Sequence, residues 1–235
     1  MATINGDDNN NVIDGTNLPD VIDGMGGDDV INGNGGSDRI FGGAGNDLID
    51  GGGGRDTING GSGNDTIFGG INSDNINGGN GDDLIFGGDG LDVLIGGSGA
   101  DEVHGGGMND NIDGAFGNDT LYGDDGDDSI NGGAGTDQLY GGAGTDTFTF
   151  VESELAASSG TFNGDVVHDF DAYVDDFIFV NDVATATDWL LVEEQLDGSV
   201  MVYLDVNNDG VADYDIVHVL NANGFEVEEA LGLHG

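Results

Sequence analysis

The chain has 235 residues, which suffices for one or two domains, but with 49 Gly and only 7% aromatic residues a core filled with Leu and Phe is not expected. Its 47 Asp and Glu face two Arg and no Lys, giving a formal net charge of −45. This charge excludes nucleic acids and anionic membranes as partners and indicates that external cations neutralise the protein.

Further classes are excluded by what the sequence lacks. Without Cys, the chain has no disulfides and no thiolate chemistry. The first residues, MATINGDDNN, contain neither the basic nor the apolar region of a Sec-type signal peptide. No apolar stretch approaches the roughly 18 residues of a membrane span. We therefore expect a soluble chain without a Sec-type signal.

A nine-residue repeat occupies residues 6–149 in sixteen unbroken units, of which GGAGNDLID (42–50) and GGNGDDLIF (78–86) are typical. Position one is Gly in all sixteen units, and position six is Asp in fifteen. Position eight is aliphatic in fifteen units and aromatic in the last. Positions one to six are typical of turns, and positions seven to nine predict a three-residue strand whose central residue is buried.

Two such units make one coil with a turn at each end, so the repeat predicts an all-β solenoid of eight coils that stack every 18 residues. Each coil buries only two aliphatic side chains, for example Ile58 and Ile67. At about 1.5–3 kcal/mol for each buried side chain, against 1–2 kcal/mol for each ordered backbone residue, this core is too thin to order the chain. Metal binding is therefore expected to be coupled to folding.

The pattern resembles the RTX (repeats-in-toxin) calcium-binding proteins, whose repeat is G-G-x-G-x-D-x-U-x. The resemblance implies a right-handed parallel β-roll with a small, mostly β C-terminal cap. It also implies a Ca²⁺ ion between turns 18 residues apart, bound by backbone carbonyls and by both Asp carboxylates. One such site would use Gly43, Gly45 and Asp47 of one turn with Gly60, Ser62 and Asp65 of the next. Six oxygen ligands suit a hard cation such as Ca²⁺.

Eight turns on each edge leave seven gaps per edge, or fourteen potential sites. Residues 6–149 carry a net charge of −26, so fourteen Ca²⁺ ions would leave the roll near neutrality. Asn11 replaces a charged ligand, and Leu18 and Met108 stand at position four, where strain is expected. We expect about twelve to fourteen sites, weakest at the N-terminal units and near Met108. The expected carboxylate ligands are Asp20, Asp29, Asp38, Asp47, Asp56, Asp65, Asp74, Asp83, Asp92, Asp101, Asp110, Asp119, Asp128, Asp137 and Asp146.

Residues 150–235 form a second unit in this interpretation, a cap that covers the open end of the solenoid. Their composition predicts strands over 165–170, 176–180, 199–205 and 215–220, and weaker helices near 184–191 and 225–231. The segment DTFTFVE…GDVVHDFDAYVDDFIFV looks like the one that closes RTX rolls.

The cap contains two further candidate features. Asp205, Asn207, Asp209 and Asp213 resemble the start of an EF-hand loop, but Ile216 stands where the bidentate Glu is required. Strand-like flanks favour a hairpin calcium loop, and an ordinary Asn/Asp/Gly turn stays the alternative. The end, GFEVEEALGLHG, resembles a type I secretion signal, and an ordinary terminal helix is the alternative.

Position nine places an aromatic column on one outer face of the roll, expected either to stack for stability or to mediate self-association. No arrangement of catalytic residues is visible: the four His form no HExxH motif, and no Ser stands in GxSxG. His104 is interpreted as a residue of the column. The column comprises Phe68, Phe86, His104, Tyr122 and Tyr140.

Three functions follow from these features. The leading hypothesis is a non-enzymatic, secreted calcium-binding protein that is exported by type I machinery and folds outside the cell. The second is the C-terminal RTX module of a larger secreted protease, lipase or alginate epimerase. Against it, Met1 followed at once by a degenerate repeat looks like a natural start. The third is a structural component of a surface layer or adhesin.

Overall fold

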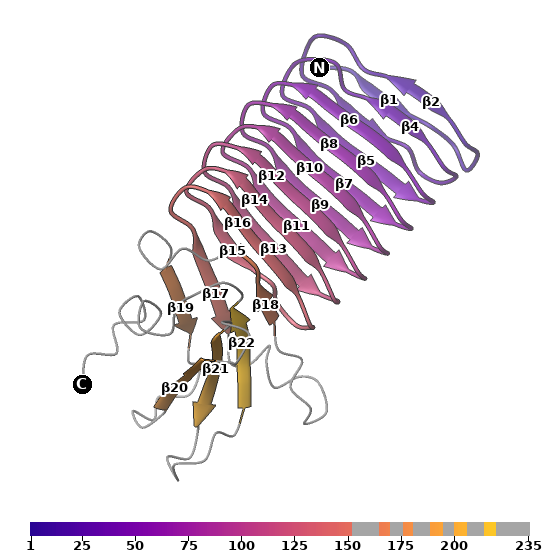
Figure 1. Ribbon diagram of the computed structural model, residues 1–235. Coiled ribbons are helices and arrows are strands. Elements are labelled where there is room, and N and C mark those ends of the chain that lie inside the picture. The colour runs from indigo at the N-terminus through magenta and orange to yellow at the C-terminus, as the bar shows by residue number, and fades with distance from the viewer. Residues whose placement is uncertain (152–164, 170–175, 181–188, 195–199, 206–213, 220–235) are drawn as a thin grey trace.

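The structure is a computed structural model that describes residues 1–151, 165–169, 176–180, 189–194, 200–205 and 214–219. All regular elements in these residues are β-strands. Two long sheets lie face to face, and the chain alternates between them along the roll (Figure 1). No helix in the described part of the chain has the length and apolar character that a membrane span needs.

The first sheet has ten strands, which follow one another in chain order. Neighbouring strands are parallel throughout, and paired residues within the repeat are 18 positions apart, as Ile58 and Ile76 are. The strands are β1 (Thr3–Asn5), β3 (Val21–Asp23), β5 (Arg39–Ala44), β7 (Thr57–Ser62), β9 (Asn75–Asn80), β11 (Val93–Ser98), β13 (Asn111–Phe116), β15 (Ser129–Asn131), β17 (Thr147–Val151) and β19 (Asp176–Val180).

The second sheet has twelve strands, and its last two pairings, β22 with β21 and β21 with β20, are antiparallel. Together the two sheets confirm the predicted parallel β-roll. In sheet order the strands are β2 (Val12–Asp14), β4 (Val30–Asn32), β6 (Leu48–Gly53), β8 (Thr66–Ile71), β10 (Leu84–Asp89), β12 (Glu102–Gly107), β14 (Thr120–Asp125), β16 (Gln138–Ala143), β18 (Asp165–Val167), β22 (Tyr214–Val219), β21 (Val200–Asp205) and β20 (Trp189–Glu194).

Most strands of the roll are twice as long as the three residues that the repeat predicted. A typical strand has six residues and includes positions one to three of the following unit, which were assigned to the turn. Position one points inward and must be Gly. A Cβ atom built on Gly69 would lie 2.5 Å from the carbonyl oxygen of Gly87, 2.8 Å from Asp74 Oδ2 and 3.1 Å from Ile76 Cδ1. The interior beside each aliphatic residue is therefore filled by backbone and carboxylate.

The core is a double column of position-eight side chains between the two sheets. These side chains are almost fully buried, from Ile13 with 6% exposure to Phe148 with 0%. Val167, which lies beyond the repeat, is also 0% exposed and belongs to the same cluster. The core is thus as narrow as the sequence predicted, and it extends into the C-terminal segment.

The C-terminal segment continues the roll before its strands turn antiparallel. β18 pairs in parallel with β16, and β19 pairs in parallel with β17. The four expected strands are present within a few residues of their predicted bounds. The helix expected near 184–191 is wrong, because Trp189–Glu194 is a strand paired along its length with β21. Cross-strand pairing decided the structure of this segment over a weak helical pattern. The helix expected near 225–231 lies outside the described residues.

Candidate metal centres between the turns

The position-six aspartates form a continuous ladder along each edge of the roll. Asp47 donates its backbone N–H to Asp65 Oδ1 at 2.8 Å, and Asp65 donates to Asp83 Oδ1 at the same distance. Each carboxylate is therefore fixed by the coil before it, with one oxygen satisfied. Since the same bond recurs every 18 residues, the repeat itself sets the orientation of these side chains.

The second oxygen of these carboxylates is the unusual feature of the turns. All fifteen aspartates are at most 4% exposed, yet the Oδ2 atoms of thirteen have no hydrogen-bond partner. Burying a charged oxygen without a partner is costly, and buried charges in proteins are normally paired or bind metals. The unpartnered Oδ2 atoms belong to Asp29, Asp38, Asp47, Asp56, Asp65, Asp74, Asp83, Asp92, Asp101, Asp110, Asp119, Asp128 and Asp137.

Burial shifts the pKa values of these carboxyl groups upward. Desolvation raises the pKa of Asp65 to about 6 and that of Asp83 to about 7, and neighbouring position-six carboxylates add to both shifts. The largest shift with a value is at Asp119, whose pKa rises to about 8 from the same causes. Without a cation, the folded roll therefore favours protonated carboxyl groups in its turns.

The backbone carbonyls of the example site face one another across two successive turns. The oxygens of Gly43 and Gly45 lie against the α-carbons of Gly61 and Gly63 in the next coil. In return, the Gly60 oxygen lies against Gly42, and the Ser62 oxygen accepts a hydrogen bond from Gly45 N at 2.8 Å. The structure thus brings the carbonyl positions to the facing sides of two turns, with Asp47 and Asp65 beside them.

This donor set fits Ca²⁺, which prefers carboxylate and carbonyl oxygens in flexible coordination. The fit rests on the unpartnered Oδ2 atoms, which are buried acceptors without donors. No group of three or more His, Cys, Asp and Glu side chains in the described residues is arranged to hold a metal ion. The ligands would therefore be two carboxylates and the carbonyls of the two turns.

Glycine at positions two and four has a conformational reason, since Gly43 and Gly45 have φ values of 116° and 128°. Met108 adopts φ 76°, so the strain expected at this non-Gly residue is present. Leu18 is not among the residues with positive φ, and the strain expected there is absent. Pro19 follows it and restricts Leu18 to extended conformations, so this turn has a different shape.

The first turn of each edge is closed by its own side chains. Asn11 donates from Nδ2 to Asp7 Oδ1 at 3.2 Å and accepts from Asp7 N at 2.7 Å. Asp20 Oδ2 accepts from Thr16 N at 2.8 Å and from Thr16 Oγ1 at 2.7 Å. The bond from Ala2 N, followed by the Thr16 hydroxyl, lowers the pKa of Asp20. These turns satisfy their polar groups without a cation, which supports the prediction of weak N-terminal sites.

A second ladder, at position five, was not predicted from the sequence. Asn46 Oδ1 accepts from Asn64 N at 2.7 Å, and Asn64 Oδ1 accepts from Asp82 N at 3.0 Å. Asp82 Oδ1 in turn accepts from Ala100 N at 2.8 Å, and this run ends there because Ala has no acceptor. The short polar residues that recur at position five were the available signal. They lie outside the buried carboxylate ladder and hold the turns in register.

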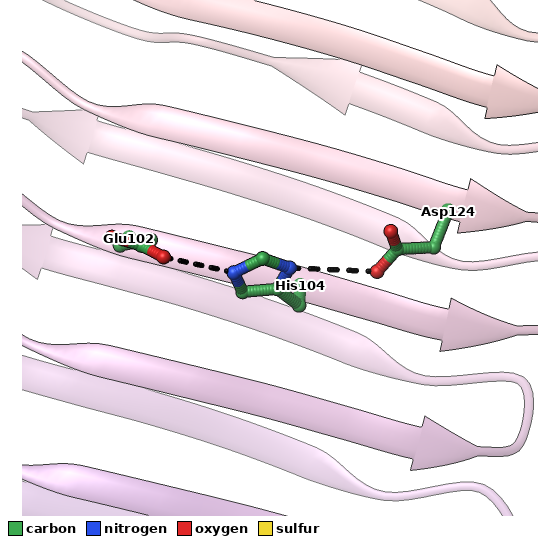
Figure 2. A network of polar contacts seen from close by, with 3 residues as sticks. All are labelled: Glu102, His104 and Asp124. Atoms are coloured by element: carbon green, nitrogen blue, oxygen red, sulfur yellow. Dashed lines mark hydrogen bonds and ion pairs between the residues drawn. The ribbon is translucent and has the colours of Figure 1, made fainter.

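The aromatic column is stacked ring on ring, as one of the two interpretations expected. Figure 2 shows His104 within it, with Nε2 at 3.0 Å from Glu102 Oε1 and Nδ1 at 3.6 Å from Asp124 Oδ2. His168 extends the column beyond the repeat, stacked on Tyr140 at 4.3 Å, and the sequence analysis missed it. Self-association through the column stays a prediction. The other centroid distances are 5.1 Å for Phe68–Phe86, 4.9 Å for Phe86–His104, 4.5 Å for His104–Tyr122 and 4.7 Å for Tyr122–Tyr140.

The candidate calcium loop of the cap is only partly within the described residues. Asp205 is the last residue of β21, while Asn207, Asp209 and Asp213 lie outside them. The strands on either side, β21 and β22, are antiparallel neighbours. These flanks are strands, as expected for a hairpin loop, and a metal site in the loop stays a prediction.

Comparisons with known proteins agree with this geometry. A family model described as RTX calcium-binding nonapeptide repeat (4 copies) matches residues 5–40, 14–49, 32–67, 68–103, 104–139 and 113–148. No curated protein matches the chain. Among solved structures, the chain is 27% identical to the AlgE6R3 subunit of the mannuronan C5-epimerase from Azotobacter vinelandii, with a TM-score of 0.45. That match covers 58% of this chain and 79% of the other.

Proposed function

Because the chain belongs to the RTX calcium-binding nonapeptide repeat family, we propose that it is a secreted, non-catalytic protein whose roll folds by binding about twelve to fourteen Ca²⁺ ions. The observation that carries the proposal is the set of thirteen buried Oδ2 atoms without a hydrogen-bond partner. Each lies in a turn beside backbone carbonyls, where a divalent cation replaces the missing donors.

The energetics of the roll support coupling between binding and folding. Each nine-residue unit buries one large apolar side chain, for example Ile67 or Ile85. That burial contributes about 1.5–3 kcal/mol, while ordering nine backbone residues costs about 9–18 kcal/mol. Ladder hydrogen bonds reduce this deficit, but the unpaired carboxylates add to it. Calcium that binds only the folded state then supplies the remaining stabilisation.

The same coupling suggests where the protein works. At the low Ca²⁺ concentration inside a cell, the net charge of −45 keeps the chain expanded by self-repulsion. Export through type I secretion machinery suits such an unfolded chain, with the acidic and then apolar C-terminus as its signal. Outside the cell, millimolar Ca²⁺ neutralises the turns and folds the roll. Secretion is tested by expressing the gene with and without a type I exporter and measuring the protein in the medium.

Far-UV circular dichroism during a Ca²⁺ titration tests the folding proposal. The chain should be largely unordered in chelator and gain its β signal cooperatively as Ca²⁺ rises. Mg²⁺ at the same concentration should produce less β structure, because it demands octahedral geometry and releases its water reluctantly. A chain with the same β content in chelator and in calcium would contradict the proposal.

A further inference from the structure

The structural repeat continues beyond the sequence repeat. Residues 165–168 stack on the coil of β16 although they follow it after 28 residues and not 18. Val166 donates to the Asp137 carbonyl at 2.8 Å, the bond that Gln138 makes with Asp119 in the coil before it. Val167 enters the core and His168 extends the aromatic column. Residues 165–168 therefore occupy positions six to nine of an additional coil.

Asp165 takes the position-six place in this additional coil. Its Oδ1 accepts from Asp137 N at 3.0 Å, as Asp137 Oδ1 accepts from Asp119 N at 2.8 Å. Asp165 is 2% exposed and Asp137 is 0% exposed. The Oδ2 atom of Asp137 is buried and has no hydrogen-bond partner. The two carboxylates thus reproduce the arrangement of every regular gap, at a place that the sixteen units do not include.

We propose that a further Ca²⁺ ion binds between Asp137 and Asp165, one coil past the recognised repeat, and that it holds residues 165–169 on the roll. The proposal rests on the calcium-dependent folding proposed above and extends it to the junction with the C-terminal segment. Gly133 and Gly135 are the turn residues whose counterparts elsewhere supply carbonyl oxygens. Two carboxylates with backbone carbonyls form the hard oxygen set that Ca²⁺ prefers.

The electrostatics of the pair agree with a cation at this place. Desolvation, followed by the negative charge of Asp137, raises the pKa of Asp165 well above its ordinary value. Two buried carboxyl groups in this position hold either a shared proton or a cation. Calcium at millimolar concentration neutralises both charges, whereas a single proton neutralises one.

Asp169 shows that the two edges of the roll are treated differently at this end. Its two carboxylate oxygens accept from Gly141 N at 2.8 Å and from Gly142 N at 3.0 Å. These amides are satisfied by a side chain of the C-terminal segment, while Asp165 continues the ladder of the opposite edge. Asp169 therefore provides a control of equal charge four residues from Asp165.

The test compares the wild-type chain, Asp165→Asn and Asp169→Asn at saturating Ca²⁺ by native mass spectrometry, with circular dichroism to confirm the roll. We expect Asp165→Asn to bind one ion fewer than wild type and Asp169→Asn to bind the same number. Hydrogen exchange gives a second readout at the Val166 and His168 amides, which bond to the coil before them. Calcium should slow their exchange in wild type by about tenfold or more, and not in Asp165→Asn.

An unchanged ion count in Asp165→Asn would overturn the proposal and leave a shared proton as the occupant of the pair. Loss of the β signal of the whole roll in this variant would also contradict it, since a terminal site leaves the other coils intact. A wild-type chain that binds no Ca²⁺ would instead refute the proposed function itself. The two failures are therefore distinguishable in one experiment.

Discussion

The substitution Asp83→Asn separates the two roles of a position-six carboxylate, because its effect on stability should change sign with calcium. Asn keeps the Oδ1 acceptor for Asp65 N, a bond of 2.8 Å, and replaces the unpartnered Oδ2 with an amide nitrogen. The roll already accommodates this residue at position six, since Asn11 stands there in the first unit. The change therefore removes one charge and leaves the ladder intact.

The expected magnitudes follow from the position of Asp83 between two gaps. With calcium bound, the variant loses an anionic ligand at two adjacent sites, and binding about 10–100-fold weaker at each site costs roughly 3–5 kcal/mol in total. Without calcium, Asp83 is a desolvated carboxyl group whose pKa is raised to about 7. Removing its charge at pH 7.5 then stabilises the roll, by about 1–4 kcal/mol.

Thermal unfolding by circular dichroism measures both signs, in 1 mM Ca²⁺ and in chelator, with an osmolyte added to bring the calcium-free chain into its transition. The matched control is Asp82→Asn, the same charge change at an exposed position-five residue whose acceptor Asn retains. It should leave stability almost unchanged in both conditions. If Asp83→Asn destabilised the roll equally with and without calcium, the carboxylate would be structural and the reasoning would be wrong.

Three further predictions follow from the geometry of the turns and the outer face. In chelator, β structure should increase on acidification: the folded position-six carboxyl groups have raised pKa values, for example about 7 at Asp74, so metal-free stability is present near pH 4 and lost as pH rises through 6–8, as a circular dichroism pH titration can show. Gly69→Ala places a Cβ 2.5 Å from a carbonyl oxygen and should destabilise the calcium-bound roll by about 1–3 kcal/mol, whereas Gly107→Ala, with its nearest contact at 3.7 Å, should not; equal melting temperatures would contradict this. Phe86→Ser removes two stacking contacts and should lower stability by about 2–4 kcal/mol without changing the ion count; light scattering would show whether it also abolishes calcium-dependent association.

The nine-residue period was sufficient to predict the roll, its core and the aspartate ladder. A strict repeat requires the same local structure sixteen times, so each unit confirms the assignment of the others. The inward direction of position eight followed from alternation in a strand. The aromatic column followed from the 18-residue coil, and the rings of Phe68 and Phe86 are indeed 5.1 Å apart.

The strand length was missed because Gly carries no side chain from which to read alternation. Gly69 and its equivalents lie in the strand and face inward, but their residue type is also typical of a turn. The additional coil was missed because an insertion moves Asp165 out of the period, and only long-range pairing brings it back beside Asp137. The strand over Trp189–Glu194 was missed because pairing with β21 outweighs local preference.

The central claim is that cations between the turns replace the hydrogen-bond donors that the buried carboxylates lack. Crystals grown in Ca²⁺ and measured at a wavelength with calcium anomalous signal test it most directly. The account predicts anomalous peaks between successive position-six residues, such as Asp47 and Asp65, at about 2.3–2.6 Å from their Oδ2 atoms. A folded roll in calcium with no peaks between its turns would contradict it.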